Sequence, residues 1–404
     1  MHHYETHEIL TDHQHGFRPG RSCETQLVIT TNDIIKALDE RKQVDAIILD
    51  FSKAFDRVPH HRLLAKLSHY GIKYKLLTWM ENFLTKRSQR VVVDGESSDW
   101  IPVTSGVPQG TVLGPLLFLS FINDLPCGIS SNIRLFADDC LLYRPISNTD
   151  DTKVLQNDLD TLHRWSQRWQ MKFNVEKCNS MTFTLRRGPI KANYHMGTSL
   201  LSVVTETTYL GLTLTCKMSW SKHISGATAR ANRILGLLRR NLRGSSQKIK
   251  ECAYLALVRP HLEYCSSVWN PYSSKDIAKI ESIQRQAARF VLNKYQYRES
   301  VSAMINELNW LSLEKRRQIA CLNLLYKIKT NQVAINPLIY LQPMSQTITR
   351  ASHPDKFKII PTRTQLYQNS FFPRTIVWWN GLPPNIITST SYEAFKVSLG
   401  SLDV

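Results

Sequence analysis

The sequence lacks three features that would assign it to common protein classes. It has no Cys-x-x-Cys pair, which argues against a zinc knuckle or finger. It has no apolar run of eighteen or more residues, so no transmembrane helix is expected. Its N-terminus (MHHYETHEIL) has no signal-peptide core, so we expect an intracellular protein, in the nucleus or the cytoplasm, that is not secreted and is not held in a membrane. The eight cysteines should then be reduced thiols.

Acidic residues are scarce relative to basic ones. The net charge is +18 and the isoelectric point is about 9.6. Between residues 217 and 250 there are nine Lys or Arg residues and no Asp or Glu. Such an excess favours a polyanionic partner, with nucleic acid the first candidate and an anionic membrane surface the second. The 404 residues, 42% of them hydrophobic, suffice for one large domain or two to three ordinary ones.

The stretch from Ile133 to Tyr143 places two adjacent carboxylates between apolar runs. Residues 133–137 are typical of a strand and residues 140–143 of its return, so Asp138 and Asp139 are predicted at the bend of a hairpin. Taken alone, a solvated Asp-Asp turn explains the pattern, because aspartate is an ordinary turn residue. Buried carboxylates would instead require a neighbouring cation.

A second carboxylate ends a run that suits a buried strand. Residues 44–49 are mostly apolar and β-branched, and Asp50 follows them directly. A carboxylate there could hold a metal ion or cap the next turn. If this strand and the hairpin are antiparallel neighbours, their three carboxylates converge. Such a group could hold two divalent ions about 3.5–4 Å apart for phosphoryl transfer, and Mg²⁺ suits carboxylate and phosphate oxygens.

The rest of the chain is read from periodicity and from turn residues. We expect loop in 1–21, strands at 89–94 and 180–185, a hairpin at 208–213 and a packed irregular tail at 362–384. We expect helices at 22–41 with Ser22 as N-cap, then at 59–70, 79–84, 116–122, 151–171, 222–243, 246–258, 274–293, 300–308 and 312–330. Gln109 is the polar side chain of the Gly/Pro-rich loop 103–115 that could reach a ligand. On helix 222–243, Arg233, Arg240 and Arg243 lie opposite the apolar stripe, which favours polyanion contact over a merely solvated face.

Six stretches then agree, in order and spacing, with a known motif series: HGFRPGRS, AIILDFSKAFD, SGVPQGTVLGPLLF, FADDCLLY, NVEK and YLGL. With them the sequence resembles the polymerase region of a LINE-type, non-LTR retrotransposon of the jockey-like kind. The resemblance implies an RNA-directed DNA polymerase that uses an RNA template, a DNA primer and dNTPs. It also implies a longer parent protein, of which this chain would be an N-terminally truncated part. The alternative is a catalytically inactive, nucleic-acid-binding remnant of such a polymerase.

The resemblance also implies roles for individual residues. The catalytic residues would be Asp50, Asp138 and Asp139, and the metal site would comprise these three with Phe51, holding Mg²⁺ or, as a substitute, Mn²⁺. The nucleotide-binding residues would be Arg18 and Arg21 on the triphosphate, Phe55 as a gate against the ribose 2′-hydroxyl, Gln109 in the pocket and Lys177 as a general acid. The nucleic-acid-binding residues would be Tyr209, Gly211, Arg230, Arg233, Arg240 and Arg243.

The fold implied is α+β, with the palm of a right-hand polymerase as its centre. We expect a partial fingers region at 1–43, a palm with an antiparallel sheet at 44–215, a helical thumb and connection at 216–335, and a C-terminal extension at 336–404.

Overall fold

The computed structural model describes residues 1–296, 298–344 and 355–401 and divides the chain into two compact units. The first unit comprises Met1–Gln26 and Arg41–Thr205, and the second comprises Leu27–Glu40 and Glu206–Val404. Within the predicted C-terminal extension, residues 345–354 and 402–404 lie outside the described part. Among the described residues, every helix is too short or too polar to cross a bilayer. The domain boundaries given above stay a prediction.

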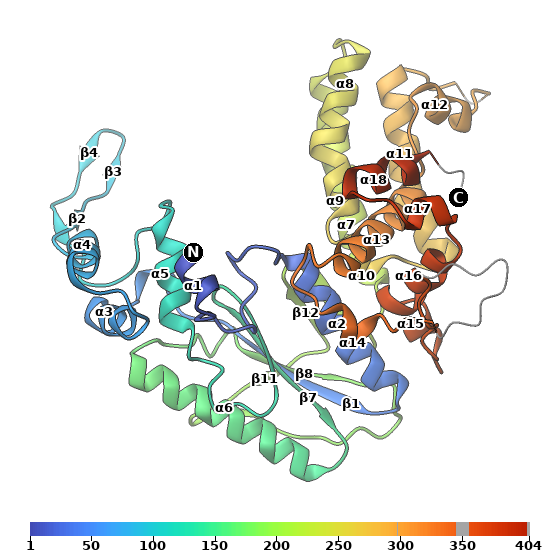
Figure 1. Ribbon diagram of the computed structural model, residues 1–404. Coiled ribbons are helices and arrows are strands. Elements are labelled where there is room, and N and C mark those ends of the chain that lie inside the picture. The colour runs from blue at the N-terminus through green and yellow to red at the C-terminus, as the bar shows by residue number, and fades with distance from the viewer. Residues whose placement is uncertain (297, 345–354, 402–404) are drawn as a thin grey trace. The chain divides into compact units, whose positions relative to one another are not determined.

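The first unit is built on a five-stranded sheet in the order β11-β8-β1-β7-β6 (Figure 1). Its strands are β1 (Gln43–Leu49), β6 (Asn132–Phe136), β7 (Asp139–Ile146), β8 (Asn179–Phe183) and β11 (Ser202–Val203). The first four pair antiparallel, as predicted, whereas the short β11 pairs parallel with β8. The predicted antiparallel sheet is therefore confirmed, and the two-residue strand β11 adds one parallel pair at its edge.

Helices cover one face of this sheet and form the main core. Ile47 and Leu49 of β1 and Leu142 of β7 pack there with apolar side chains of the helices, including Leu159 of α6. Trp165 of α6 is half-buried against the same core, which agrees with a packing role. The helices of this unit are α1 (His2–Thr6), η1 (Ala54–Asp56), α3 (His60–His69), α4 (Tyr74–Leu84), α5 (Leu113–Ile122) and α6 (Thr149–Trp169).

Three local predictions for this unit need correction. Residues 1–21 are not all loop, because α1 forms near the start. The strand predicted at 89–94 is split between β2 (Ser88–Gln89) and β3 (Val92–Val93), which pair with different partners, β5 (Ile101–Pro102) and β4 (Glu96–Ser97). Asp139 does not lie in the hairpin bend but is the first residue of β7, paired with Phe136, so that only Ala137 and Asp138 form the turn. A further short hairpin joins β9 (His195–Met196) and β10 (Ser199–Leu200).

The described residues of the second unit form mainly helices, together with a hairpin of β12 (Glu206–Tyr209) and β13 (Leu212–Thr215), which confirms the hairpin predicted near residue 210. The helix α2 (Cys23–Asp39) has its first turn in the first unit and the rest here. Ser22 accepts a hydrogen bond from the Thr25 backbone N–H, as expected of an N-cap. The remaining elements are α7 (Ser221–Asn241), α8 (Gln247–Ala253), the π-helix η2 (Tyr254–Val258), α9 (Arg259–Glu263), α10 (Ser266–Trp269), α11 (Ser274–Leu292), α12 (Val301–Glu307), α13 (Leu313–Lys329), α14 (Pro337–Tyr340), α15 (Gln365–Gln368), α16 (Phe371–Asn380), α17 (Pro384–Ile387) and α18 (Tyr392–Gly400).

The C-terminal segment is more regular than predicted. Residues 362–384 form α15 and α16 instead of an irregular tail. Pro373 is accommodated because it lies in the first turn of α16, where backbone N–H groups have no acceptor inside the helix. Phe372 and Trp379 of this helix are fully buried. Together with Tyr367 and Phe371, which are also buried, they form part of the core, whereas Trp378 is half-buried.

Candidate active site

The strand order brings the predicted catalytic carboxylates to one end of the sheet. Strands β1 and β7 are antiparallel neighbours, with Leu49 paired to Cys140. Continuing this register by one residue places Asp50 opposite Asp139, and Asp138 lies next to it in the β6–β7 turn. The predicted pairing of the two strands is thus confirmed. Segments that are far apart in sequence share one edge for a simple reason: an antiparallel pair aligns the end of one strand with the start of the other.

Burial, and then neighbouring negative charge, raises the pKa values of Asp138 and Asp139. Partial burial, followed by the negative charge of Asp50, raises the pKa of Asp138 above its usual range. Asp139 is exposed as a residue, yet desolvation of its carboxyl group, and then the charges of Asp138 and Asp50, raise its pKa to about 6. Both pKa shifts arise first from desolvation of the carboxylate and then from the negative charge of its neighbours. A positively charged ligand would lower the free energy of this group.

The three carboxylates are suitable ligands for a hard divalent cation, although their side chains do not already surround a metal position. Across residues 1–296, 298–344 and 355–401, no three His, Cys, Asp or Glu side chains are preformed to hold a metal ion. Carboxylate oxygens are nevertheless the ligands that Mg²⁺ prefers, and Mg²⁺ sites in phosphoryl-transfer enzymes use one or two carboxylates together with substrate phosphates. The raised pKa values of Asp138 and Asp139 are what such a site shows without its cation.

The turn at residues 174–177 places a lysine beside Asp50. The backbone carbonyl of Asp50 accepts from the Asn174 N–H at 2.8 Å, and the Asp50 N–H donates to Cys178 Sγ at 3.4 Å. The turn is closed by the Lys177 N–H, which donates to the Asn174 carbonyl at 3.0 Å. The exposed Lys177 ammonium lies 3.6 Å from Asp50 Oδ2. The backbone of this turn is therefore fixed to the strand end, while its lysine side chain stays accessible.

Two predicted nucleotide-pocket residues lie in the first unit: Phe55 shortly after β1, and Gln109 in the loop before α5. Phe55 lies in η1, is half-buried and stacks on Phe118 with ring centroids 4.3 Å apart, so its ring is held in place. Gln109 is exposed, and its Nε2 donates to Asp56 Oδ1 at 2.7 Å. This bond joins the Gln109 loop to η1. Phe51 is buried and stacks on Phe173 at 4.3 Å.

Arg18 and Arg21 are already engaged by groups of the same unit. Arg18 donates two hydrogen bonds to Glu5, at 2.9 and 3.1 Å, and one to the Thr11 carbonyl at 2.7 Å; its side chain is 7% exposed. Arg21 donates to the Asp12 carboxylate at 2.6 Å. For either guanidinium to reach a triphosphate, these partners would have to be exchanged. Their role at a nucleotide stays a prediction.

Gln14 and Gly16 adjoin the acidic turn and were not identified from the sequence. Gln14 is buried, and its Oε1 accepts from the Ala137 N–H at 2.9 Å. Around it, the His15 N–H donates to the Leu135 carbonyl at 2.8 Å, so residues 13–16 run along β6. A Cβ on Gly16 would overlap the backbone nitrogen of Ala137. The only signal in the sequence was a glycine next to a basic loop, which did not point to the turn 123 residues away.

The predicted nucleic-acid-binding residues lie in the second unit. On α7, residues such as Ile224 and Leu235 are buried. The four predicted arginines are exposed: Arg230, Arg233 and Arg240 lie on α7, and Arg243 lies just after it. Tyr209 is buried in β12, so its ring is a packing residue. Gly211, in the hairpin turn, has a φ of +81°. A Cβ there would also lie 3.0 Å from the ring of Tyr264.

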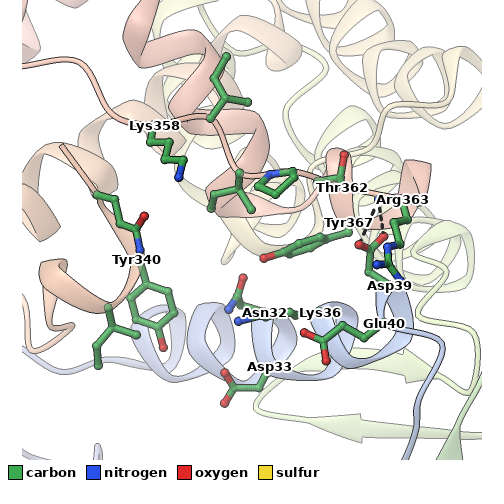
Figure 2. Close-up of a pocket in the computed structure, with 15 residues that line it drawn as sticks. Asn32, Asp33, Lys36, Asp39, Glu40, Tyr340, Lys358, Thr362, Arg363 and Tyr367 are labelled. Atoms are coloured by element: carbon green, nitrogen blue, oxygen red, sulfur yellow. Dashed lines mark hydrogen bonds between the residues drawn. The ribbon is translucent and has the colours of Figure 1, made fainter. Parts of the chain in front are cut away.

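A cavity of about 570 Å³ in the second unit is separate from these residues (Figure 2). It lies between α2 and the stretches 339–342 and 358–367, and Figure 2 shows Asn32, Tyr340 and Tyr367 around it. The carboxylate of Asp39 accepts from the backbone N–H of Arg363 at 3.0 Å, which fixes the C-terminal stretch against α2. No predicted catalytic or nucleotide-binding residue lines this cavity. It is therefore not the candidate active site.

Comparisons with known proteins agree with the motif series. The chain is 31% identical over 304 residues to a probable RNA-directed DNA polymerase from transposon BS of Drosophila melanogaster, covering 70% of this chain and 33% of that protein. It is 30% identical to the RNA-directed DNA polymerase from mobile element jockey of the same species, covering 68% of this chain and 31% of that protein. The chain thus spans about a third of the length of these curated relatives.

A solved telomerase from Candida tropicalis, in complex with a fragment of telomeric RNA, superposes with a TM-score of 0.40 at 11% identity, covering 77% of this chain and 47% of that one. This likeness is too low to define the fold by itself. The family model described as reverse transcriptase (RNA-dependent DNA polymerase) matches residues 1–214, more than half of the chain. Reverse transcriptases generally use divalent metal ions. The chain therefore belongs to the reverse transcriptase family, together with the polymerases of jockey-like non-LTR retrotransposons.

Proposed function

We propose that this chain is the polymerase part of a non-LTR retrotransposon protein and extends a DNA primer on an RNA template. The observation that carries the proposal is the shared sheet edge. There, the register of β1 and β7 aligns Asp50 with Asp139 beside Asp138. The raised pKa values of Asp138 and Asp139 support it, because they indicate a site that favours a cation.

In the proposed reaction, the primer 3′-hydroxyl oxygen attacks the α-phosphorus of a dNTP, a new phosphodiester bond forms, and pyrophosphate leaves. Asp50, Asp138 and Asp139, with the backbone of Phe51, would hold Mg²⁺ or Mn²⁺. When bound, these ions would supply a lowered pKa for the attacking hydroxyl and charge neutralisation for the phosphates. The Lys177 ammonium, 3.6 Å from Asp50 Oδ2, would balance part of the negative charge of the three carboxylates.

The surrounding residues would select and orient the nucleotide. Phe55, held by its stacking on Phe118, would exclude a 2′-hydroxyl and so favour dNTPs over ribonucleotides. Gln109 would contact the nucleotide after giving up its bond to Asp56. Lys177, exposed beside Asp50, would donate a proton to the leaving pyrophosphate.

Arg18 and Arg21 would approach the triphosphate after exchanging their intrachain partners. Arg230, Arg233, Arg240 and Arg243, together with the exposed Gly211 of the β12–β13 turn, would contact the template and primer. Phosphate contacts by exposed arginines give binding that is independent of sequence and sensitive to salt.

Primer extension on an RNA template with Mg²⁺ tests the proposal. We expect dNTP incorporation by the chain and a loss of at least about a thousandfold for Asp138→Asn, which keeps the shape but removes the charge. Asp150→Asn is the matched control, because Asp150 is an exposed aspartate of α6 that pairs with Lys153. Equal incorporation by the Asp138 and Asp150 variants would contradict the assignment.

The alternative, a remnant that binds nucleic acid without polymerising, gives a different outcome in the same preparation. Filter binding of the template–primer across a salt series would show tight, salt-dependent binding, and no incorporation would accompany it. Incorporation that depends on Asp138 excludes this alternative. Absence of both binding and incorporation would exclude both functions.

A further inference from the structure

The residue before Asp138 has an unfavourable backbone conformation. Ala137 has a φ of +53°, in the left-handed region that residues with a Cβ rarely adopt. It is the first of the two residues that link β6 and β7, and it is almost fully buried. A conformation of this kind persists only where its surroundings enforce it. The direction in which the Asp138 side chain leaves the turn depends on it, because Ala137 sets the path of the backbone into Asp138.

The group that enforces this conformation is the amide of Gln14. Its Oε1 accepts from the Ala137 N–H at 2.9 Å, and its Nε2 donates to the Ala137 carbonyl at 3.3 Å. Both backbone polar groups of the strained residue therefore bond to one side chain. The same Oε1 also accepts from the Gly16 N–H at 2.7 Å. Gln14 is 2% exposed, so water does not compete for these bonds.

The segment that carries Gln14 is itself fixed against β6. The Leu135 N–H donates to the His13 carbonyl at 2.9 Å, and the His15 N–H donates to the Leu135 carbonyl at 2.8 Å. Gly16 allows this close approach, since a Cβ there would overlap the Ala137 nitrogen. Gln14 is therefore held on both sides, and its amide has little freedom to follow a moving turn.

We propose that Gln14 is a positioning residue: it holds Ala137 in the left-handed conformation and thereby aims the Asp138 carboxylate for catalysis. The inference rests on the proposed polymerase function, because it assigns Asp138 a role in the reaction. Gln14 touches neither substrate nor metal in this role. It acts through the peptide groups on both sides of Ala137.

The test combines a disrupting variant with one that removes the strain. Gln14→Met keeps the side-chain length and removes all three hydrogen bonds. Ala137→Gly, added to Gln14→Met, lets the turn adopt a positive φ at no steric cost. We expect Gln14→Met to lower kcat by about 10- to 100-fold, because a small misplacement of a catalytic group has an effect of this size. The KM for dNTP should change little. The double variant should regain about tenfold of kcat, although it still lacks the Gln14 amide.

The matched control is Gln43→Met. Gln43 is also fully buried, and it binds both backbone groups of one residue in the same way: its Oε1 accepts from the Ile190 N–H at 2.9 Å and its Nε2 donates to the Ile190 carbonyl at 2.8 Å. Its Nε2 also donates to Asp45 Oδ1 at 2.8 Å. It lies at the opposite end of β1 from Asp50. A loss of stability from removing a buried glutamine should therefore occur in both variants, whereas a loss of kcat should occur only in Gln14→Met.

Two measurements do not depend on activity. One is the exchange rate of the Ala137 amide hydrogen, and the other is the affinity for Mn²⁺, measured by electron paramagnetic resonance. In Gln14→Met we expect exchange at Ala137 to become about tenfold faster and Mn²⁺ affinity to fall. Three outcomes would each overturn the inference. The first is unchanged amide exchange and kcat in Gln14→Met, the second is an equal loss of kcat in Gln14→Met and Gln43→Met, and the third is no recovery of kcat in the double variant. If the unsubstituted chain incorporates no dNTP, the proposed function fails, and amide exchange with Mn²⁺ binding still decides whether Gln14 positions the turn.

Discussion

Mild acid should destabilise the first unit through His15. The ring is 2% exposed, and its Nδ1 lies 3.3 Å from Thr25 Oγ1. Burial first, and then the charge of Arg21 and other nearby arginines, lowers the pKa of His15 from 6.5 to about 3. The unfolded chain binds a proton near pH 6.5 and the folded chain does not. The contribution of His15 to stability is therefore complete above pH 6.5 and is lost progressively as the pH falls toward 3.

The size of the effect follows from this difference. At pH 5, about 1.5 units below the pKa of His15 in the unfolded chain, proton binding stabilises the unfolded form by about 1.4 kcal/mol per unit. The free energy of unfolding of the first unit should therefore fall by about 2 kcal/mol relative to pH 7. Urea unfolding at pH 7 and pH 5 measures this loss for the chain and for His15→Gln, which cannot titrate. We expect the chain to lose about 2 kcal/mol more than the variant. Titration of His13 and His60, whose pKa values burial also lowers, cancels in the difference.

The control is His61→Gln, because His61 is exposed on α3. This variant should keep the pH dependence of the unsubstituted chain. Amide exchange of residues 13–16 and 132–137 shows where the loss occurs, since the His15 N–H bonds to the Leu135 carbonyl. The reasoning is refuted if His15→Gln and His61→Gln respond equally to acid.

Three further predictions concern the gate, the packing of the N-terminal segment and the basic helix. Phe55→Ala should reduce discrimination against ribonucleotides by roughly 10- to 100-fold in competitive incorporation; unchanged discrimination would exclude the gate role. Gly16→Ala should lower the free energy of unfolding by about 2 kcal/mol because its Cβ meets backbone, whereas Gly188→Ala, with open space around it, should not. Arg233→Gln should reduce the slope of log affinity against log salt by about 1 in template–primer binding, and an unchanged slope would show that α7 makes no phosphate contact there.

The sequence allowed the sheet edge to be predicted because its signals are local. The apolar run before Asp50 predicts a buried strand, and the two runs around Asp138 predict a hairpin, which the structure confirms. The position of Asp139 was predicted less well. Two adjacent aspartates are equally compatible with a two-residue bend at either position, and it is the pairing of Phe136 with Asp139 that settles which residues form the turn.

The predictions that failed depend on contacts that no local pattern encodes. The tail was interpreted as irregular because of its prolines, but Pro373 occupies a position in α16 where a missing N–H has no cost. The strand predicted at 89–94 is interrupted because the strand pairing changes partner between Gln89 and Val92: β2 pairs with β5, and β3 pairs with β4. Gln14 could not be found at all, since its side chain bonds to a residue 123 positions away.

The candidate active site is a sheet edge whose main-chain atoms are held by hydrogen bonds to two distant segments. Residues 13–16 hold the Asp138 turn through the Ala137 peptide. The turn before Lys177 holds the Asp50 backbone. Neither attachment uses the carboxylate oxygens, because the hydrogen bonds are made to main-chain atoms of Ala137 and Asp50. The acidic groups therefore remain available to a cation and substrate while their positions are fixed, which is the arrangement that electrostatic preorganisation requires.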